Sequence, residues 1–337
     1  MKELGIPDIV QLASAFYGSS ILFSALERGV FKAIEDLGGE ASLEPLAQAT
    51  KSSPRGLRLL LDAAVATGLL RKTDNRYANT QAGKLALIPG APADLSDAIG
   101  YNRDVYPLWG RLSKLVETGA PVEPPKLHLG EDHDRTRRFA LSMRGRALAI
   151  GRGIVPMIDL KGCKRLLDLA GGPATYAELL VKANEGLSCV TVDVPAIASI
   201  AEELVAEDGL SDRIECRAGD YHADTYETGA YDAVTIFGCL HQESPDAIRD
   251  ILKRAAAALK PGGRVFVLDM MTDATHTSPA FSALFAVNMA LTMPNGWVFS
   301  DEELKGWMRE AGLVPAETKP VPPPMPHWLV TAQKPSE

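Results

Sequence analysis

The sequence predicts an α/β protein in which a mainly helical N-terminal domain precedes a doubly wound, mostly parallel β-sheet. Two observations support this fold class. Up to about residue 160 the apolar residues recur every three or four positions, which is typical of amphipathic helices. From about Lys164 onward, short apolar strand-like runs alternate with helical patterns, as in successive βαβ units.

The composition is that of a globular protein, with 46% hydrophobic and 23% charged residues over a length of 337. The net charge of −8 argues against nucleic acid as a partner. The N-terminus has no apolar signal core, and we expect no run to approach the length of a membrane span. The four cysteines are far apart, which favours free thiols. We therefore expect a cytoplasmic protein without a membrane partner.

The N-terminal domain shows the helix, helix, hairpin order of a winged helix. We expect Ser42 to cap a short helix, and Ser53 with Pro54 to begin the next one. A small hairpin is then expected to turn at Asp74 and Asn75.

The second domain is expected to contain strands separated by helices. The expected strands are Arg165–Ala170, Cys189–Val194, Ile214–Gly219, Tyr231–Gly238, Arg264–Met270 and His327–Gln333. The expected helices include Thr175–Ala183, Ala196–Glu207 and Pro245–Leu259, with Ser244 as the cap of the last. Ser300 and Glu303 predict a capping box for a further helix that ends near Gly312.

A cofactor site is predicted where three successive strands end. The first strand runs into "DLAGGPA", in which glycines allow close approach of a ligand and a helix N-terminus offers free N–H groups. The second strand ends at Asp193, which suits two ribose hydroxyls. The third is followed by Asp220, which can accept from an adenine amino group, and by Tyr221, whose ring can stack on the base. These ends share one sheet edge, so together they predict a nucleoside cofactor.

A candidate general base follows the fourth strand. His241 in "FGCLHQESP" lies between a strand end and a capped helix, beside the predicted cofactor site. A histidine can take up a proton near neutral pH, so this position suits acid–base chemistry.

With these motifs, the chain resembles the small-molecule O-methyltransferases that use S-adenosylmethionine, the group of caffeate, hydroxyindole and polyketide O-methyltransferases. The resemblance covers nearly the whole chain, from the winged-helix domain through "DLAGGPA", "VDVP" and "AGDY" to "LHQESPDAIRDILKRAAAALKPGGRVFVLD" and "FSDEELKGWMREAGL". It implies a Rossmann-like class I methyltransferase domain with a seven-stranded sheet. It also implies a homodimer that acts on a small, aromatic or polyketide acceptor and releases S-adenosylhomocysteine.

The resemblance also implies roles for individual residues. His241 would remove the proton from the acceptor hydroxyl, and Asp269 would flank this base. The loop from Ala170 to Ala174 would face the methionine part of the cofactor. The cofactor-binding set is then Ala170, Gly171, Gly172, Asp193, Asp220, Tyr221 and Phe237. The helix Ser278–Met293 would line the acceptor pocket, and the pocket set is Met143, Phe285, Asn288 and Met289. No metal is expected.

Three departures from the family pattern affect this reading. Ala170 and Ala174 replace the outer glycines of the loop, and a methyl group there is costly if the backbone angle φ is positive. The second acidic flanker of the base aligns near Val298 and is missing. Gln242 and Glu243 stand where aspartate and tryptophan are more usual.

Two other functions fit parts of the sequence. Seven basic and two acidic residues lie between Lys51 and Lys84, so a winged helix there could touch DNA. A carbon methyltransferase or a non-methylating relative would share the fold, and His241, Glu243 and His327 would be possible metal ligands. His327 also suits a plain position at the start of a strand. We expect residues 1–115 to form the dimerisation domain, 116–160 connecting helices and 161–337 the catalytic domain.

Overall fold

The computed structural model describes residues 3–123, 132–322 and 326–336. The chain divides into two compact units, Met1–Arg103 and Asp104–Glu337. Each unit has its own buried hydrophobic cluster, which is the physical basis of the division. The domain boundaries that the sequence predicts at residues 115 and 160 stay predictions.

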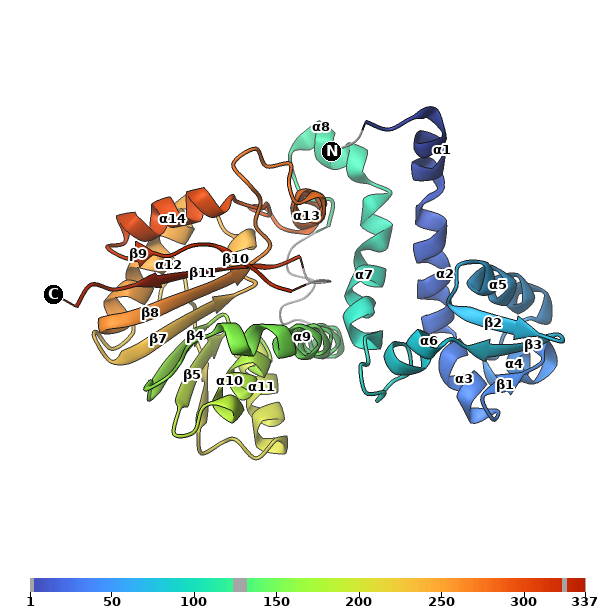
Figure 1. The fold of residues 1–337 in the computed structure, drawn as a ribbon, viewed down its shortest axis with the longest axis horizontal. Coiled ribbons are helices and arrows are strands. Elements are labelled where there is room, and N and C mark those ends of the chain that lie inside the picture. Colours follow the sequence, from blue (N-terminus) through green and yellow to red (C-terminus); the bar gives the residue numbers. More distant parts are fainter. Residues whose placement is uncertain (1–2, 124–131, 323–325, 337) are drawn as a thin grey trace. The chain divides into compact units, whose positions relative to one another are not determined.

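The first unit contains short helices around a small antiparallel sheet (Figure 1). Its helices are α1 Ile6–Ser14, α2 Phe16–Glu27, α3 Val30–Asp36, α4 Leu43–Ala49, α5 Pro54–Ala66, α6 Gln81–Ala86 and the start of α7 Ser96–Trp109. Its strands are β1 Glu40–Ala41, β2 Leu70–Thr73 and β3 Arg76–Asn79, in the order β1-β3-β2. The hairpin predicted at Asp74 and Asn75 is confirmed, and both residues have positive φ, at 46° and 65°.

The caps predicted in this unit differ in outcome. The Ser53 side chain accepts a hydrogen bond from Gly56 N, as expected of an N-cap. Ser42 occupies the N-cap position of α4, but its side chain makes no capping hydrogen bond. The predicted N-cap position of Ser42 is therefore confirmed, but within the described residues the expected capping hydrogen bond of its side chain is absent.

Acidic side chains pair with the basic residues of the winged-helix region. Lys72 lies 2.6 Å from Asp62, and Arg76 lies 2.8 Å from Glu40. The buried face of α5 carries Leu57, Leu61 and Ala64, which pack inside the unit. Because several of the cations are paired and the buried face of the helix is used for packing, neither feature favours DNA binding.

The N-terminal helices present an apolar surface. By length and composition, Ile6–Glu27 is apolar enough to cross a membrane, since an 18-residue window within it has a mean hydropathy of 1.5, and only 6% of that window is buried. The expectation that no run approaches this length is therefore wrong. Leu12 and Phe16 are more than half exposed, as are Ile6, Ile9, Val10 and Tyr17, so these two helices carry several large apolar side chains on their surface.

The second unit is built on one large sheet with helices on both faces (Figure 1). Its helices are the end of α7, α8 Leu112–Thr118, α9 His133–Ile154, η2 Val155–Met157, α10 Thr175–Ala183, α11 Pro195–Glu207, η3 Leu240–Gln242, α12 Pro245–Ala258, α13 Ala280–Thr292 and α14 Asp301–Glu310. Its strands are β4 Arg165–Leu169, β5 Ser188–Asp193, β6 Ile214–Ala218, β7 Tyr231–Phe237, β8 Leu259–Asp269, β9 Val314–Pro315, β10 Lys319–Pro320 and β11 Trp328–Gln333.

The strand order is β10-β11-β8-β7-β4-β5-β6, and β9 pairs with β11 off this path. Strands β8, β7, β4, β5 and β6 are parallel, and β11 runs antiparallel to β8. The order reverses at β4, which pairs with β5 on one side and β7 on the other. The predicted doubly wound, mostly parallel sheet is confirmed, and within the described residues it has eight strands where the resemblance implied seven.

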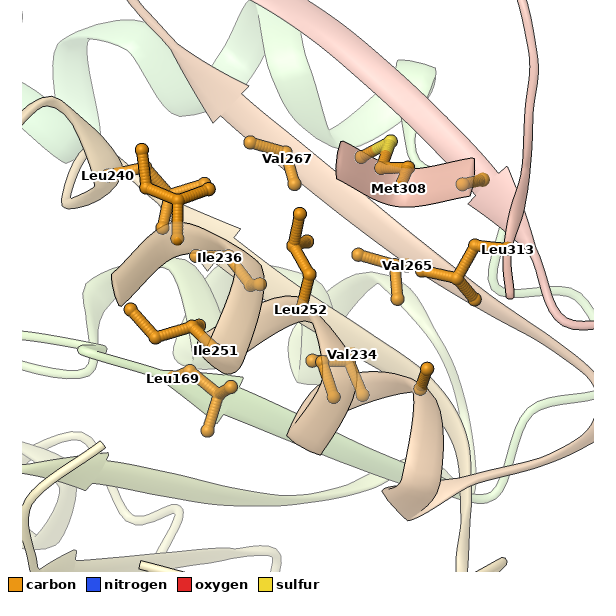
Figure 2. Packing of buried hydrophobic residues seen from close by; sticks show 14 of the residues in the cluster. Leu169, Val234, Ile236, Leu240, Ile251, Leu252, Val265, Val267, Met308 and Leu313 are labelled. Atoms are coloured by element: carbon orange, nitrogen blue, oxygen red, sulfur yellow. The ribbon is translucent and has the colours of Figure 1, made fainter. Parts of the chain in front are cut away.

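Each face of the sheet has its own core. Helices α12 and α14 cover one face, where Leu252 packs among Val234, Val265 and Val267 (Figure 2). Helices α9, α10 and α11 cover the other face, where Ile150, Leu180 and Ala201 belong to one cluster. A sheet buried on both faces holds its strand ends rigidly, and these ends carry the site.

The predicted boundaries hold with small shifts. Strand β8 begins at Leu259, five residues earlier than expected, because the segment before Arg264 also pairs with β7 across an irregular register. The cap at Ser244 and the box of Ser300 with Glu303 are confirmed. The short strands β9 and β10 were not expected, since two-residue strands leave no pattern in a sequence.

Candidate active site

The candidate site lies beyond the carboxyl ends of the parallel strands. The glycine turn follows β4, Asp193 ends β5, Asp220 follows β6, His241 follows β7 and Asp269 ends β8. Adjacent parallel strands end at the same edge, so five segments distant in sequence are placed together. This is the position where ligands bind in open α/β sheets.

The glycine turn is fastened to the end of β5. Gly172 N donates to Asp193 Oδ2 over 2.8 Å, and Val194 N donates to Asp193 Oδ1 over 2.8 Å. Burial raises the pKa of the Asp193 carboxyl, although these two backbone donors oppose the effect. Each oxygen has a second lone pair, so the carboxylate keeps capacity to accept from ligand hydroxyls.

The two glycines are required for different reasons. A Cβ at Gly171 would overlap Thr191 Oγ1 and Asp168 Oδ2, so only glycine fits that space. Gly172 has open space around it but a φ of 57°, which favours glycine by conformation. Because no other group of the described residues lies within 4 Å of the position that a Cβ on Gly172 would take, a ligand can approach the backbone closely there.

Both alanines that replace the usual glycines have left-handed backbone conformations. The φ of Ala170 is 53° and that of Ala174 is 61°. An L-residue in this region costs about 1–2 kcal/mol relative to glycine. The Ala174 methyl is fully buried within the α9–α11 face, so packing offsets part of its strain, whereas Ala170 is only partly buried. The strain foreseen for positive φ is therefore present at both positions.

Beneath the turn lies a buried carboxyl group. Asp168 in β4 accepts hydrogen bonds from Thr235 Oγ1 at 2.6 Å and Thr191 Oγ1 at 3.2 Å, its register partners in β7 and β5. Burial raises the pKa of Asp168 to about 6, against the opposing effect of the two hydroxyl donors.

The loop after β6 contacts the segment after β7. Tyr221 OH donates to Glu243 Oε1 over 2.6 Å, and His222 lies 2.8 Å from both Asp220 Oδ1 and Glu243 Oε2. The Tyr221 and His222 rings stack with centroids 4.2 Å apart. Neither His222 nor the role of Glu243 was predicted from the sequence, because no spacing rule connects residues 21 positions apart on different loops.

A histidine–carboxylate pair stands at the end of β8. His241 Nδ1 lies 2.6 Å from Asp269 Oδ1, and both side chains are buried. The same carboxylate accepts from Met270 N, and His241 N lies 3.3 Å from its second oxygen. A carboxylate can only accept, so Nδ1 carries the hydrogen and Nε2 is left as the basic nitrogen.

The other side of this imidazole is apolar. The Phe285 ring meets His241 edge to face, with centroids 5.1 Å apart. Val298, at the position of the missing acidic flanker, packs with Met270, Phe285 and Met289. The histidine is therefore oriented by one carboxylate and by packing.

The remaining predicted residues, from the pocket set and the cofactor-binding set, have different surroundings. Asn288 is buried in α13, and its Oδ1 accepts from Trp109 Nε1 over 3.0 Å, a partner that the sequence did not suggest. Met143 lies partly buried on α9. Phe237 is buried at the end of β7 and packs edge to face against Tyr176, with centroids 5.1 Å apart.

His327 directly precedes β11 and is buried, with no hydrogen-bond partner for its Nδ1 within the described part of the chain. Burial lowers its pKa to about 4, so it is uncharged at neutral pH. Within the described residues, no cluster of three or more histidine, cysteine, aspartate or glutamate side chains is arranged to hold a metal.

Comparison with known proteins identifies the family. The model of an O-methyltransferase domain matches residues 126–314, and that of an O-methyltransferase dimerisation domain matches residues 10–88. The 3-hydroxy-5-methyl-1-naphthoate 3-O-methyltransferase of Streptomyces sahachiroi is 30% identical over 90% of this chain and 88% of its own length. The tetracenomycin polyketide synthesis 8-O-methyl transferase TcmO of Streptomyces glaucescens is 29% identical over 95% of both chains.

A crystal structure of human N-acetylserotonin methyltransferase with S-adenosylmethionine shares the fold, with a TM-score of 0.88 at 21% identity over 99% of both chains. The fold is therefore that of the class I methyltransferases. The chain belongs to the O-methyltransferase family that carries an N-terminal dimerisation domain. It is an enzyme whose methyl donor is S-adenosylmethionine, and methylation of a hydroxyl is favoured over the DNA-binding and carbon-methylating alternatives.

The strained alanines give a first prediction. Ala170→Gly is expected to raise the free energy of unfolding by about 1 kcal/mol, because strain is relieved and little packing is lost. Ala174→Gly is expected to change it by less than about 0.5 kcal/mol, because loss of a buried methyl cancels the relief. Urea unfolding of the three proteins measures this, with Gly172→Ala as a control that should lose about 1 kcal/mol. Equal effects at both alanines would contradict this account.

The buried Asp168 gives a second prediction. A carboxyl whose pKa is raised on folding stabilises the fold below its unfolded value near 3.8, and this contribution is lost as pH rises through about 6. The free energy of unfolding of Asp168→Asn, relative to wild type, is therefore expected to rise by about 2 kcal/mol between pH 4 and pH 7, because the unfolded carboxyl is already partly ionised at pH 4. Urea unfolding of the cofactor-free proteins across this range measures it. A constant difference would refute the raised pKa.

Proposed function

We propose that the strand-end residues bind S-adenosylmethionine in an extended arrangement along the sheet edge. The backbone of Gly171 and Gly172 would receive the methionine part, with Ala170 beside it. Asp193 would accept from the ribose hydroxyls. Asp220 and Tyr221 would contact the adenine, and Phe237 would close the floor of the site. The open space over Gly172 and the accepting capacity of Asp193 support this fit.

His241 is the proposed general base, and the geometry that carries this proposal is its 2.6 Å contact with Asp269. When bound, the cofactor supplies an electrophilic methyl group on a sulfonium. His241 Nε2 takes the proton from the acceptor hydroxyl, and Asp269 stabilises the imidazolium that results. The apolar contact with Phe285 excludes water from the ring, so proton transfer is confined to the bound hydroxyl.

The proposed acceptor is a hydroxyl on a small aromatic or polyketide ring. Phe285 and Met289 offer apolar contact from α13, and Met143 from α9 would complete the wall. Asn288, oriented by Trp109, would contribute a polar contact. Two relatives are named for a hydroxynaphthoate and for a tetracenomycin polyketide, which supports the same acceptor class.

The dimerisation domain is proposed to pair two copies of this chain through the exposed face of α1 and α2. Burying these apolar side chains between copies would remove them from water, which is the usual driving force of an obligate interface. A homodimer in the cytoplasm, with no nucleic acid or membrane partner, stays the predicted assembly and location.

The base assignment is tested by substitution. His241→Ala is expected to lower kcat by about 10²–10⁴-fold, because the proton acceptor is lost. Its affinity for S-adenosylhomocysteine should stay within about threefold, because the imidazole is needed only for the reaction. Asp269→Asn should lower kcat by at least about tenfold, through a misoriented imidazole. The assay screens hydroxynaphthoate and polyketide phenols by mass spectrometry, and unchanged turnover in His241→Ala would remove this residue as base.

The proposed dimer is tested by introducing charged side chains into the exposed apolar face of α1 and α2. The wild-type protein is expected to run at twice its chain mass of 36.1 kDa in light scattering, and Leu12→Glu with Phe16→Glu should run as a monomer. Two carboxylates cannot be buried unpaired at an apolar interface. Val314→Glu, at a side chain of similar exposure in β9, is the matched control and should stay dimeric. A dimeric double variant would place the interface elsewhere.

A further inference from the structure

The side chains of Asp220, Tyr221, His222 and Glu243 form one hydrogen-bonded network at the sheet edge, which we call the adenine-end network. In the sheet, β6 and β7 are separated by β4 and β5. The network nevertheless joins the loop after β6 to the segment after β7. Four neighbouring strands, β7, β4, β5 and β6, end around the proposed cofactor site. The network connects the ends of the outer two, β6 and β7.

Glu243 is the buried centre of this network. Its residue is only 7% exposed, and its two carboxylate oxygens accept separately, one from Tyr221 OH at 2.6 Å and one from His222 Nε2 at 2.8 Å. Its own backbone is held as well, because Trp297 Nε1 donates to Glu243 O over 2.7 Å. A buried carboxylate with both oxygens bonded is a fixed point to which the more exposed loop can be tied.

His222 carries this constraint to Asp220. Its Nδ1 lies 2.8 Å from Asp220 Oδ1, which also accepts from His222 N at 2.9 Å. Within the described residues, Asp220 Oδ2 accepts no hydrogen bond, so the carboxylate is oriented through one oxygen and keeps the other for a ligand. This is the oxygen that would accept from an adenine amino group.

Both ring nitrogens of His222 face carboxylate oxygens, which only accept hydrogen bonds. An imidazole has donors on both nitrogens only when it is protonated, so the complete network requires the imidazolium. The other charged or titratable groups around it are Asp224 in its own loop, Tyr221, and Arg254 of α12, whose Nη2 donates to Tyr221 O over 3.0 Å. Partial burial lowers the pKa of His222, but the hydrogen bonds and charges of Glu243 and Asp220 outweigh it and raise the pKa above 6.5.

We propose that Glu243 and His222 are positioning residues for the adenine end of the cofactor site. Glu243 holds the Tyr221 ring and, through protonated His222, the Asp220 carboxylate in the positions that meet the base. Cofactor affinity consequently falls when His222 loses its proton. This inference rests on the proposed cofactor contacts of Asp220 and Tyr221, and it assigns a function to the residue that departs from the usual family pattern at position 243.

The test measures binding of S-adenosylhomocysteine by calorimetry from pH 6 to pH 9, which needs no turnover by His241. Wild-type affinity is expected to fall about threefold across this range, a modest change because His222 is half exposed. Glu243→Ala should weaken binding roughly tenfold at pH 6, because Tyr221 and His222 both lose their partner. In turnover, the same variant should raise KM for S-adenosylmethionine more than it lowers kcat.

Glu243→Gln separates positioning from a purely structural role. Its amide oxygen can still accept from Tyr221 OH, and its amide nitrogen can donate to neutral His222. Affinity at pH 9 should therefore stay near the value that the wild-type protein has at pH 6, and the dependence on pH should disappear. His276→Gln is the matched control, since His276 is equally exposed and faces Glu303 at 3.6 Å, away from the network. It should keep the wild-type pH profile.

The outcomes distinguish two failures. Wild-type affinity for S-adenosylhomocysteine in Glu243→Ala, or an unchanged pH profile in Glu243→Gln, would overturn the role of the network and leave the cofactor site intact. Absence of binding by the wild-type protein at every pH would overturn the proposed cofactor contacts themselves, and the positioning role with them.

Discussion

Strand β4 is the constraint on which the rest of the site depends. It pairs in parallel with β5 on one side and β7 on the other, and only its first residue is incompletely buried. Because both neighbours are in fixed register, the glycine turn, Asp193 and the end of β7 start from one rigid edge. Asp168 reinforces this point, since its carboxyl bonds to Thr191 and Thr235 and ties the three strands together. The strain at Ala170 and Ala174 persists because this surrounding structure holds it.

The loops at the candidate site are in turn held by carboxylates. Asp193 holds the glycine turn, Asp269 holds His241, and Glu243 holds Tyr221 and His222. In each case an acceptor-only group selects the orientation of its donor. A site built in this way is organised before any ligand binds, which lowers the entropy lost on binding.

Much of the fold could be predicted because its signals are local. Alternating strands and helices, the caps at Ser53, Ser244 and Ser300, and the hairpin at Asp74 depend on residues close in sequence. The placement of the candidate site residues near strand ends could also be predicted, since parallel strands finish at a common edge. The apolar length of the N-terminal helices was misjudged, because small polar residues interrupt the apolar ones between Ile6 and Glu27 while the mean hydropathy over this segment stays high.

The sequence by itself determined the α/β class, the order of the strands and helices along the chain, and the acidic residues that end successive strands. Only the tertiary structure decided that Ala170 and Ala174 adopt positive φ and that Glu243 joins Tyr221 to His222. Secondary structure follows from periodicity over a few residues. Hydrogen bonds between loops depend instead on strand order and register, which bring together groups more than twenty residues apart.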